Sequence, residues 1–368
     1  MPIIFIFHKV PFRLRVEMKR FFLRSAFGVV CISASSAVWA AEVLRVLAWP
    51  GYADPDWVSE FEKRHDARLE VTFIDTDEAL WEKLSKNRGE FFDVFAANTA
   101  ELQRYIDQSI AAPIRAARIP NTRHQLARFR KLDKIKSINR DGYLYAIPFA
   151  YSEMGLIYDK NQIKQAPTSM SEMWNKKYKG KVVLHDGSNH NFSFAALTIG
   201  IKDPFNLSRN EMAHSVNRLL ELRDQNPFFY NSPEEGTQAF IKNKAALMFA
   251  NYGNQQFKLL RAAGADVGYI VPKEGALAWL DCWAISIKAR NKPLAEQWIN
   301  FTLDKMVSNQ LTQRQGLSNT LVKSNISARD KIIWIQSSED FSLRTQYWDR
   351  IRSGNGKNGN SRPKKPVV

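Results

Sequence analysis

Apolar strands and amphipathic helices alternate along the first part of this chain. Val43–Leu47 is an apolar run, and Asp54 and Pro55 then mark a helix start, because aspartate caps helices and proline suits their first turn. The alternation repeats twice more, with strands expected at residues 69–74 and 92–96 and helices near residues 79–84 and 102–106. This βαβαβα order predicts an α/β fold with a mainly parallel sheet and helices on both of its faces.

The rest of the chain continues the alternation and is long enough for a second lobe. A chain of 368 residues suits two domains, each with its own core. Tyr143–Asp159 contains Pro148 and predicts two extended runs around a bend, which is a candidate crossing between lobes. Trp174–Lys181 is a polar turn. Further strands are expected at residues 182–185, 245–250, 267–271 and 283–287, and helices at residues 191–199, 211–222 and 294–303.

Residues 1–40 have the features of a leader that directs export. Met18, Lys19 and Arg20 give a basic start, residues 21–38 are mostly apolar or small, and Ala40 completes a small-residue cleavage site. Translation from Met1 and from Met18 both remain open. The run is interrupted by a charge and several serines, so it does not predict an uncleaved membrane span. Cleavage would leave a periplasmic chain starting at Ala41, with Cys282 as its single cysteine, since Cys31 lies in the leader.

The net charge of +16 is concentrated toward the two ends. Residues 351–368 form a basic tail rich in Gly, Asn, Ser and Pro, and such a composition predicts disorder because little apolar surface is available to bury. The tail suits either a solvated end or a tether to an acidic partner. Basic residues elsewhere are dispersed and accompany no nucleic-acid-binding motif, so no nucleic-acid partner is expected.

Three stretches resemble the spermidine/putrescine-binding proteins of ABC importers. They are LAWPGYADPDWVSEFEK (Leu47–Lys63), MSEMWNKKYKGKVVL (Met170–Leu184) and VPKEGALAWLDCWAISIKARNKPLAEQWINF (Val271–Phe301), of which the third is the most specific. Their order and spacing match that family across nearly all of residues 42–350. The resemblance implies the two-lobed periplasmic binding protein fold, with crossing hinge strands and the ligand between the lobes.

The expected positions of several side chains agree with this resemblance. Ligands of open α/β sheets bind outside the carboxyl ends of the strands, where Trp49 and Tyr52 follow the first strand. Trp279 and Asp281 are expected in a turn just before a strand at Trp283–Ile287. A polyamine needs flat apolar walls for its methylenes, and carboxylates or aromatic faces for its ammonium groups.

The resemblance also implies a role for each candidate site residue. Trp49 and Tyr52 would form ring walls, Trp279 a stacking platform and Asp281 the amine anchor. Further ligand contacts are expected from Asn98, Thr99, Asp186, Ser232 and Tyr252. No cofactor and no metal are implied.

The chain departs from the family pattern at several of these positions. Ala100 and Leu317 stand where the family usually has tyrosines, and an acidic pair of the family is reduced to Asp186 followed by Gly187. The ligand is then a polyamine or a related small organic amine, and the partner of a second ammonium group stays open.

Other functions compete with amine transport. A metal or acid–base interpretation is suggested by His185, Asp186 and His190, but their spacing matches no strong motif. The chain also has no P-loop, nucleophile elbow or dinucleotide motif. We therefore expect no enzyme. A receptor of this type delivers its ligand to an ABC permease or presents its liganded form to a membrane sensor protein, and the same fold also suits a different solute.

The expected mechanism is closure of two lobes around the ligand. The first lobe would comprise residues 41–147 and 280–321, and the second residues 148–279 and 322–350. The mature chain would not span the membrane, and a monomer is expected.

Overall fold

The computed structural model describes residues 41–323 and 331–354, which excludes the expected leader and most of the expected basic tail. The first elements alternate as the sequence predicts. Strands β1, β2 and β3 are parallel neighbours in the order β2-β1-β3. The elements in chain order are β1 (Glu42–Ala48), α1 (Pro55–His65), β2 (Ala67–Phe73), α2 (Asp77–Ser85), η1 (Lys86–Gly89), β3 (Val94–Asn98) and α3 (Thr99–Asp107).

Local chemistry sets the ends of these elements. Helix α1 begins at Pro55, as predicted. Helix α2 follows Thr76, whose hydroxyl accepts a hydrogen bond from the backbone N–H of Ala79 at 3.1 Å. Strand β3 begins two residues later than expected, because the carboxylate of Asp93 forms a buried ion pair with Arg45 (2.7 Å) at the entry to the strand.

Short elements connect α3 to a long strand, β6. They end in a small antiparallel hairpin, β4 with β5. These elements are η2 (Ala116–Arg118), η3 (Pro120–His124), α4 (Ala127–Arg130), η4 (Leu132–Lys134), η5 (Lys136–Ile138), β4 (Asn139–Arg140) and β5 (Tyr143–Leu144).

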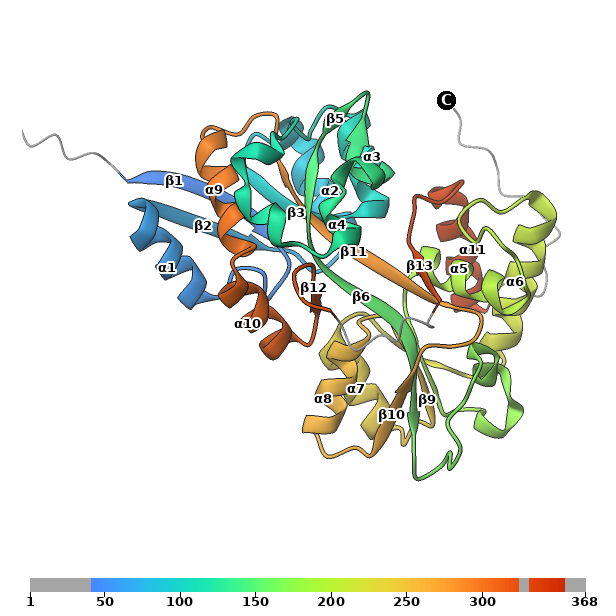
Figure 1. Cartoon of the computed structure of the whole chain (residues 1–368). Coiled ribbons are helices and arrows are strands. Elements are labelled where there is room, and N and C mark those ends of the chain that lie inside the picture. The colour runs from blue at the N-terminus through green and yellow to red at the C-terminus, as the bar shows by residue number, and fades with distance from the viewer. Residues whose placement is uncertain (1–40, 324–330, 355–368) are drawn as a thin grey trace, which may run out of the picture. The chain divides into compact units, whose positions relative to one another are not determined.

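Two antiparallel strands, β6 (Ala146–Asp159) and β11 (Ala276–Ile285), join two separate apolar cores. In β6, Ile147 packs in the core around β1 and β3, whereas Leu156 packs in the core around β7 and β9. Likewise Trp283 of β11 belongs to the former core and Leu277 to the latter. Figure 1 shows the two strands running side by side from one group of helices to the other. Strand β6 lies in the segment that the sequence predicted as a crossing. It is one continuous strand through Pro148, however, and not two extended runs around a bend.

The second core is built on another set of parallel strands. Strand β7 lies between β8 and β9 and is parallel to both, while β10 pairs antiparallel with β6. The elements are η6 (Met170–Trp174), η7 (Lys176–Tyr178), β7 (Val182–His185), α5 (Ser188–Thr198), α6 (Arg209–Arg223), β8 (Phe228–Tyr230), α7 (Pro233–Lys242), β9 (Leu247–Ala250), α8 (Asn254–Ala262) and β10 (Val267–Ile270).

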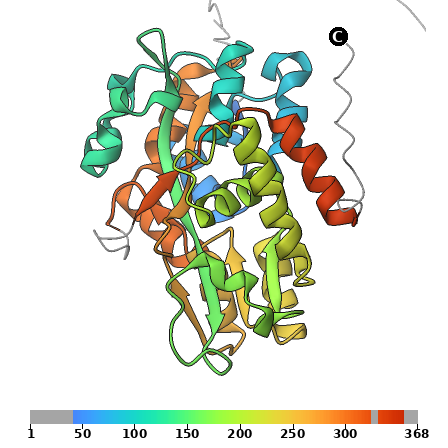
Figure 2. The ribbon, with the colours of Figure 1, turned by 90° about the vertical axis from the view of Figure 1, so that its right-hand side faces the viewer.

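After β11 the chain returns to the first core and then ends on the second. Trp298 and Val307 are fully buried in the first core, whereas Trp348 is buried in the second. Figure 2 shows the last helix beside α5 and α6. The elements are α9 (Lys292–Thr302), α10 (Lys305–Gln315), β12 (Ser318–Asn319), β13 (Ile332–Trp334) and α11 (Phe341–Ser353).

We call the elements around the first core the first lobe (β1–β3, α1–α3, α9 and α10), and those around the second core the second lobe (β7–β9, α5–α8 and α11). Each lobe has three adjacent parallel strands, and the crossing strands add the antiparallel pairs. The predicted two-lobed α/β fold is therefore confirmed. Within the described ranges, no helix is long and apolar enough to span a membrane.

A second local prediction is also wrong. The segment from Trp279 to Asp281 is not a turn but the middle of β11, which starts at Ala276 rather than Trp283. The strand is irregular at this point, because its register with β6 shifts between Asp281 and Cys282, opposite Pro148. A proline lacks the N–H that a regular ladder needs, which explains the irregularity.

Candidate functional site

Polar and aromatic side chains gather at the carboxyl ends of the parallel strands in the first lobe. Trp49 and Tyr52 follow β1, Asp77 follows β2, and Asn98 is the last residue of β3. Since the strands are parallel neighbours, these positions share one edge of the sheet, which is the usual ligand-binding edge of α/β folds.

Strand β11 adds Asp281 to this edge. Asp281 is the register partner of Asn98 in β3, and its carboxylate accepts a 2.6 Å hydrogen bond from the hydroxyl of Tyr52. Only 6% of Asp281 is exposed. Burial raises the pKa of its carboxyl to about 7, while the hydrogen bond from Tyr52 acts in the opposite direction. The structure thus brings together the predicted amine anchor and one of the predicted ring walls.

A second carboxylate, which our sequence interpretation missed, lies beside this pair. The amide nitrogen of Asn98 donates to both carboxylate oxygens of Asp77, at 3.0 and 3.2 Å. Removal from water raises the pKa of Asp77 well above its ordinary value, and the charges of Glu101 and Asp281 add to this effect. Its position after the second parallel strand was the available signal, because that loop meets the Trp49 loop at the same edge.

Trp279 connects this edge to the second lobe. It lies two residues before Asp281 in β11, so both side chains project from the same face of the strand. Its ring packs against both apolar cores, and its indole N–H donates to the backbone carbonyl of Asn251 at 3.2 Å. The indole N–H of Trp49 is buried and has no hydrogen-bond partner within the described part of the chain.

The corresponding edge of the second lobe carries histidines and a tyrosine. His185 ends β7, His190 lies in the first turn of α5, and Tyr252 follows β9. The ring of His185 is 5.9 Å from that of His190 and 5.9 Å from that of Tyr252. Burial lowers the pKa of His185 to about 3 and that of His190 to about 4. Both imidazoles are therefore uncharged at neutral pH.

Four predicted site residues have partners within the fold. The carboxylate of Asp186 accepts hydrogen bonds from the indole of Trp348 (2.8 Å) and from Arg352 (2.7 Å). The hydroxyl of Ser232 caps α7 by accepting from the N–H of Glu235. The buried hydroxyl of Thr99 is directed at the carbonyl of Ile335 (3.4 Å), and the hydroxyl of Tyr252 donates to the carbonyl of Asn231 (2.6 Å).

The comparison with known proteins identifies the family. The family of bacterial extracellular solute-binding proteins matches residues 56–328. This chain belongs to that family. Among curated relatives, the spermidine/putrescine-binding periplasmic protein 1 of Haemophilus influenzae is 24% identical over 300 residues, which is 81% of this chain and 79% of the relative. The corresponding protein of Escherichia coli is 23% identical over 320 residues, 84% of each chain.

Solved structures agree on the fold of this solute-binding protein. The spermidine/putrescine ABC transporter substrate-binding protein PotD of Streptococcus pneumoniae superposes with a TM-score of 0.70 at 17% identity, covering 85% of this chain and 98% of the other. The family and its periplasmic relatives confirm the predicted location in the periplasm and the predicted function in solute binding.

Two positions at which this solute-binding protein lacks an expected tyrosine have apolar surroundings. Leu317 is buried in the first core, and Ala100 packs against the second. At both positions the side chain packs against an apolar core and contributes no aromatic ring.

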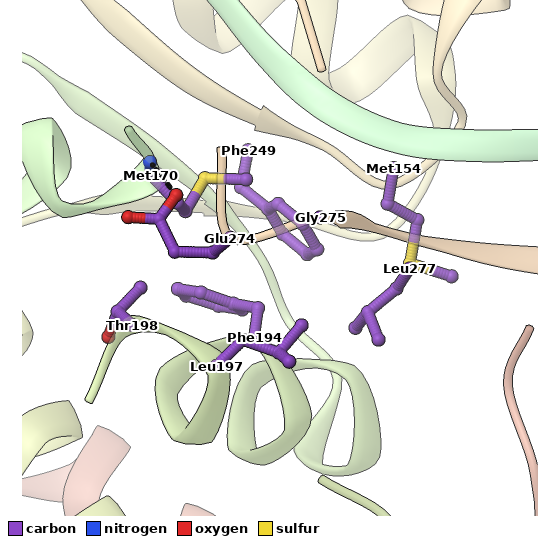
Figure 3. A pocket seen from close by; sticks show the side chains of 9 residues that line it. All are labelled: Met154, Met170, Phe194, Leu197, Thr198, Phe249, Glu274, Gly275 and Leu277. Carbon is purple, nitrogen blue, oxygen red and sulfur yellow. Dashed lines mark hydrogen bonds between the residues drawn. The ribbon is translucent and has the colours of Figure 1, made fainter. Parts of the chain in front are cut away.

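The cavity in Figure 3 lies inside the second lobe and is distinct from the site at the strand edges. Its volume is about 10 Å³, which is enough for one water molecule at most. Mostly apolar side chains line it, from Met154, Met170, Phe194, Leu197, Thr198, Phe249, Glu274, Gly275 and Leu277.

The three residues behind the metal or acid–base alternative do not form a common site. The two imidazoles are near each other, but the carboxylate of Asp186 pairs with Arg352 instead. Within residues 41–323 and 331–354, no group of three or more His, Cys, Asp or Glu side chains is arranged to hold a metal ion.

Proposed function

We propose that this protein captures a small organic amine of the polyamine class between its lobes and delivers it, chemically unchanged, to an ABC importer. One observation carries the proposal. Asp281 is a buried carboxylate that accepts a hydrogen bond from a neutral hydroxyl, that of Tyr52. An ionised carboxylate without a nearby cation is unfavourable in such surroundings, and the ammonium group of a ligand would remove this penalty.

The neighbours of Asp281 support an organic cation over a metal ion. Trp279 offers an aromatic face two residues away in the same strand, and a desolvated cation over tryptophan is stabilised by about 2 kcal/mol. The side chain of Asp77 adds a second carboxyl group to this edge, and the charge of Asp281 raises the pKa of that group. The names of the relatives point to the same ligand class, since they are spermidine- and putrescine-binding proteins.

Delivery to an importer requires a conformational change that depends on the ligand, and the fold suggests a movement of the two lobes. We propose that residues 41–147 with 280–321 move against residues 148–279 with 322–350 by bending of β6 and β11. The lobes contact each other through polar groups. The side-chain amide of Asn254 donates a hydrogen bond to the carbonyl of Gly316 (3.0 Å), and the ammonium of Lys258 donates one to the carbonyl of Thr312 (3.0 Å). A ligand that binds one arrangement better shifts the population toward it.

The proposed closure of the lobes also indicates the kind of protein partner. A monomer whose two lobes close together presents a surface that differs between its free and liganded forms, which an ABC permease can distinguish. Genes for a permease and an ATPase next to the gene for this chain would support import. A neighbouring gene for a membrane sensor would instead support a signalling role.

A thermal-shift screen of the purified mature protein tests the proposed function. Putrescine, spermidine, agmatine and N-acetylputrescine are compared with glucose, glutamate and phosphate, because a ligand that binds only the folded state raises the melting temperature. We expect at least one amine to stabilise the protein and none of the other solutes to do so. The Asp281→Asn variant should lose the response. Stabilisation by a sugar or an anion alone would refute the proposal.

A further inference from the structure

The two edges at which the ligand is proposed to bind differ in charge. In the first lobe, Asp281 and Asp77 place two carboxylates beside Tyr52 and Asn98. Arg104, the basic residue of α3, forms its ion pair with Glu101 at 2.7 Å. This edge is therefore suited to a cation.

At the carboxyl ends of β7 and β9, the carboxylate that the structure describes is that of Asp186. The buried Glu153 lies instead in the crossing strand β6, opposite Ala278. Asp186 is held by Arg352 and Trp348. Near Tyr252, Glu234 and Glu235 are exposed at the start of α7, and Glu235 accepts a hydrogen bond from the backbone N–H of Asn231 (2.7 Å).

Uncharged hydrogen-bonding groups occupy that edge instead. The Nδ1 atom of His190 is 2.7 Å from the amide oxygen of Asn251. If this nitrogen donates to that oxygen, Nε2 of His190 is left as an acceptor. The Nδ1 atom of His185 is buried and has no hydrogen-bond partner within the described residues. The ring of His185 can take this position because residue 187 is a glycine. A Cβ atom on Gly187 would lie only 2.6 Å from Nδ1 of His185.

Trp279 connects the two edges. Its strand carries Asp281 two residues further on, and its indole N–H is bonded to the carbonyl of Asn251, the residue whose side chain contacts His190. The charge of Asp77 also acts on Tyr252 in the opposite lobe. A short chain lying along Trp279 would thus have a carboxylate pair at one end and a neutral imidazole pair at the other.

We propose that the natural ligand has one cationic end and one uncharged hydrogen-bonding end, as in a monoacylated diamine, with the cation at Asp281 and Asp77 and the neutral end at His185 and His190. This inference rests on the proposed function and restricts its ligand class. A neutral amide carries both a donor and an acceptor, which match the donor and acceptor nitrogens of neutral imidazoles. A second ammonium group would lose its hydration at this end without gaining a carboxylate. The buried Arg344 is not available to a terminal carboxylate, since its guanidinium already pairs with Glu339 (2.6 Å).

Calorimetric titration with ligands that share a four-carbon chain tests the inference. N-acetylputrescine, putrescine, butylamine and 4-aminobutanoate differ only at the second end. We expect N-acetylputrescine to bind at least about tenfold more tightly than each of the other three. Equal or tighter binding of putrescine or 4-aminobutanoate would overturn the inference. Whether the protein captures an amine or another solute would then be decided separately. Failure of every amine to bind would overturn the proposed function as well.

Variants at His190 provide an independent test. His190→Glu places a carboxylate at the second end and should reverse the preference in favour of putrescine, whereas the neutral control His190→Gln should keep the preference for N-acetylputrescine. Circular dichroism and melting temperature establish that both variants fold. If the folded Glu variant retains the preference of the unmodified protein, His190 does not receive the second end and the proposed placement is wrong. If a variant does not fold, the titrations of the unmodified protein decide the question.

Discussion

Replacing Asp281 with asparagine is expected to stabilise the ligand-free protein while abolishing its affinity for amines. Asparagine is close in size to aspartate, and its carbonyl can still accept the hydrogen bond that Tyr52 donates. The variant therefore removes the charge and keeps the packing. The expected changes in stability and affinity have opposite signs, so loss of folding cannot account for the loss of binding.

The size of the stability change follows from the pKa. The folded protein holds the carboxyl of Asp281 at a pKa of about 7, against an ordinary value of 3.8. Each pKa unit corresponds to about 1.4 kcal/mol, so ionisation of Asp281 destabilises the folded state by about 4 kcal/mol above pH 7. The neutral asparagine avoids this penalty.

The sign of the pH dependence is fixed by the direction of the shift. Between pH 4 and pH 7 the folded state binds more protons at Asp281 than the unfolded state does, because its pKa is raised. The contribution of this residue to the free energy of unfolding therefore falls as pH rises through this window. Between pH 5 and pH 8 the fall amounts to about 2–3 kcal/mol, and it should be absent in Asp281→Asn.

Urea unfolding of both proteins at pH 5 and pH 8 measures this difference. The stability gain of Asp281→Asn over the unmodified protein should be larger at pH 8 than at pH 5 by about 2–3 kcal/mol. Asp75→Asn is the matched control, since Asp75 is an exposed carboxylate in the loop after β2. Its stability should change by less than about 0.5 kcal/mol at either pH. A gain for Asp281→Asn that is independent of pH, or a loss of stability at pH 8, would refute the buried-carboxylate argument.

Three further predictions concern the ligand. Asp77→Asn should weaken amine binding about tenfold or more in calorimetry, because it removes one of the two carboxylates, whereas Asp75→Asn should leave the affinity unchanged. Equal effects of the two variants would show that only the general negative field matters. Trp279→Ala should weaken binding by about 2 kcal/mol, or about 30-fold, with an unchanged circular dichroism spectrum. An unfolded variant would assign Trp279 to core packing. Amine affinity should fall by up to about tenfold per pH unit below pH 7, because binding then requires Asp281 to lose its proton. An affinity that is flat from pH 5 to pH 8 would contradict this coupling.

Sequence reasoning predicted the architecture because the relevant signals are local. The alternation of apolar runs and capped helices fixed the order of β1 to α3, and the extended segment around Pro148 indicated a crossing strand. The same reasoning placed Tyr52 at the carboxyl edge of the parallel strands, where its hydroxyl donates a hydrogen bond to Asp281. Two local descriptions were wrong. Pro148 lies within a continuous strand and not at a bend, and the segment from Trp279 to Asp281 is a strand and not a turn, since an aspartate within an apolar run looks like a break when its burial is unknown.

The remaining features of the site depend on contacts between distant parts of the chain. Asp186 pairs with Arg352, which is 166 positions further along the sequence, and no local pattern indicates that pair. The neutrality of His185 and His190 follows from burial by several elements and not from their spacing. Asp77 could have been predicted as a site residue, because the topology alone brings the loop after β2 next to the loop after β1.

The structure of a complex with an amine ligand tests the central claim most directly. If the protein is an amine receptor anchored by Asp281, the ligand nitrogen will lie within about 3 Å of the Asp281 carboxylate, and its carbon chain will lie against the ring of Trp279. A ligand whose nitrogen lies away from both residues, or that binds outside the region between the two lobes, would contradict the account.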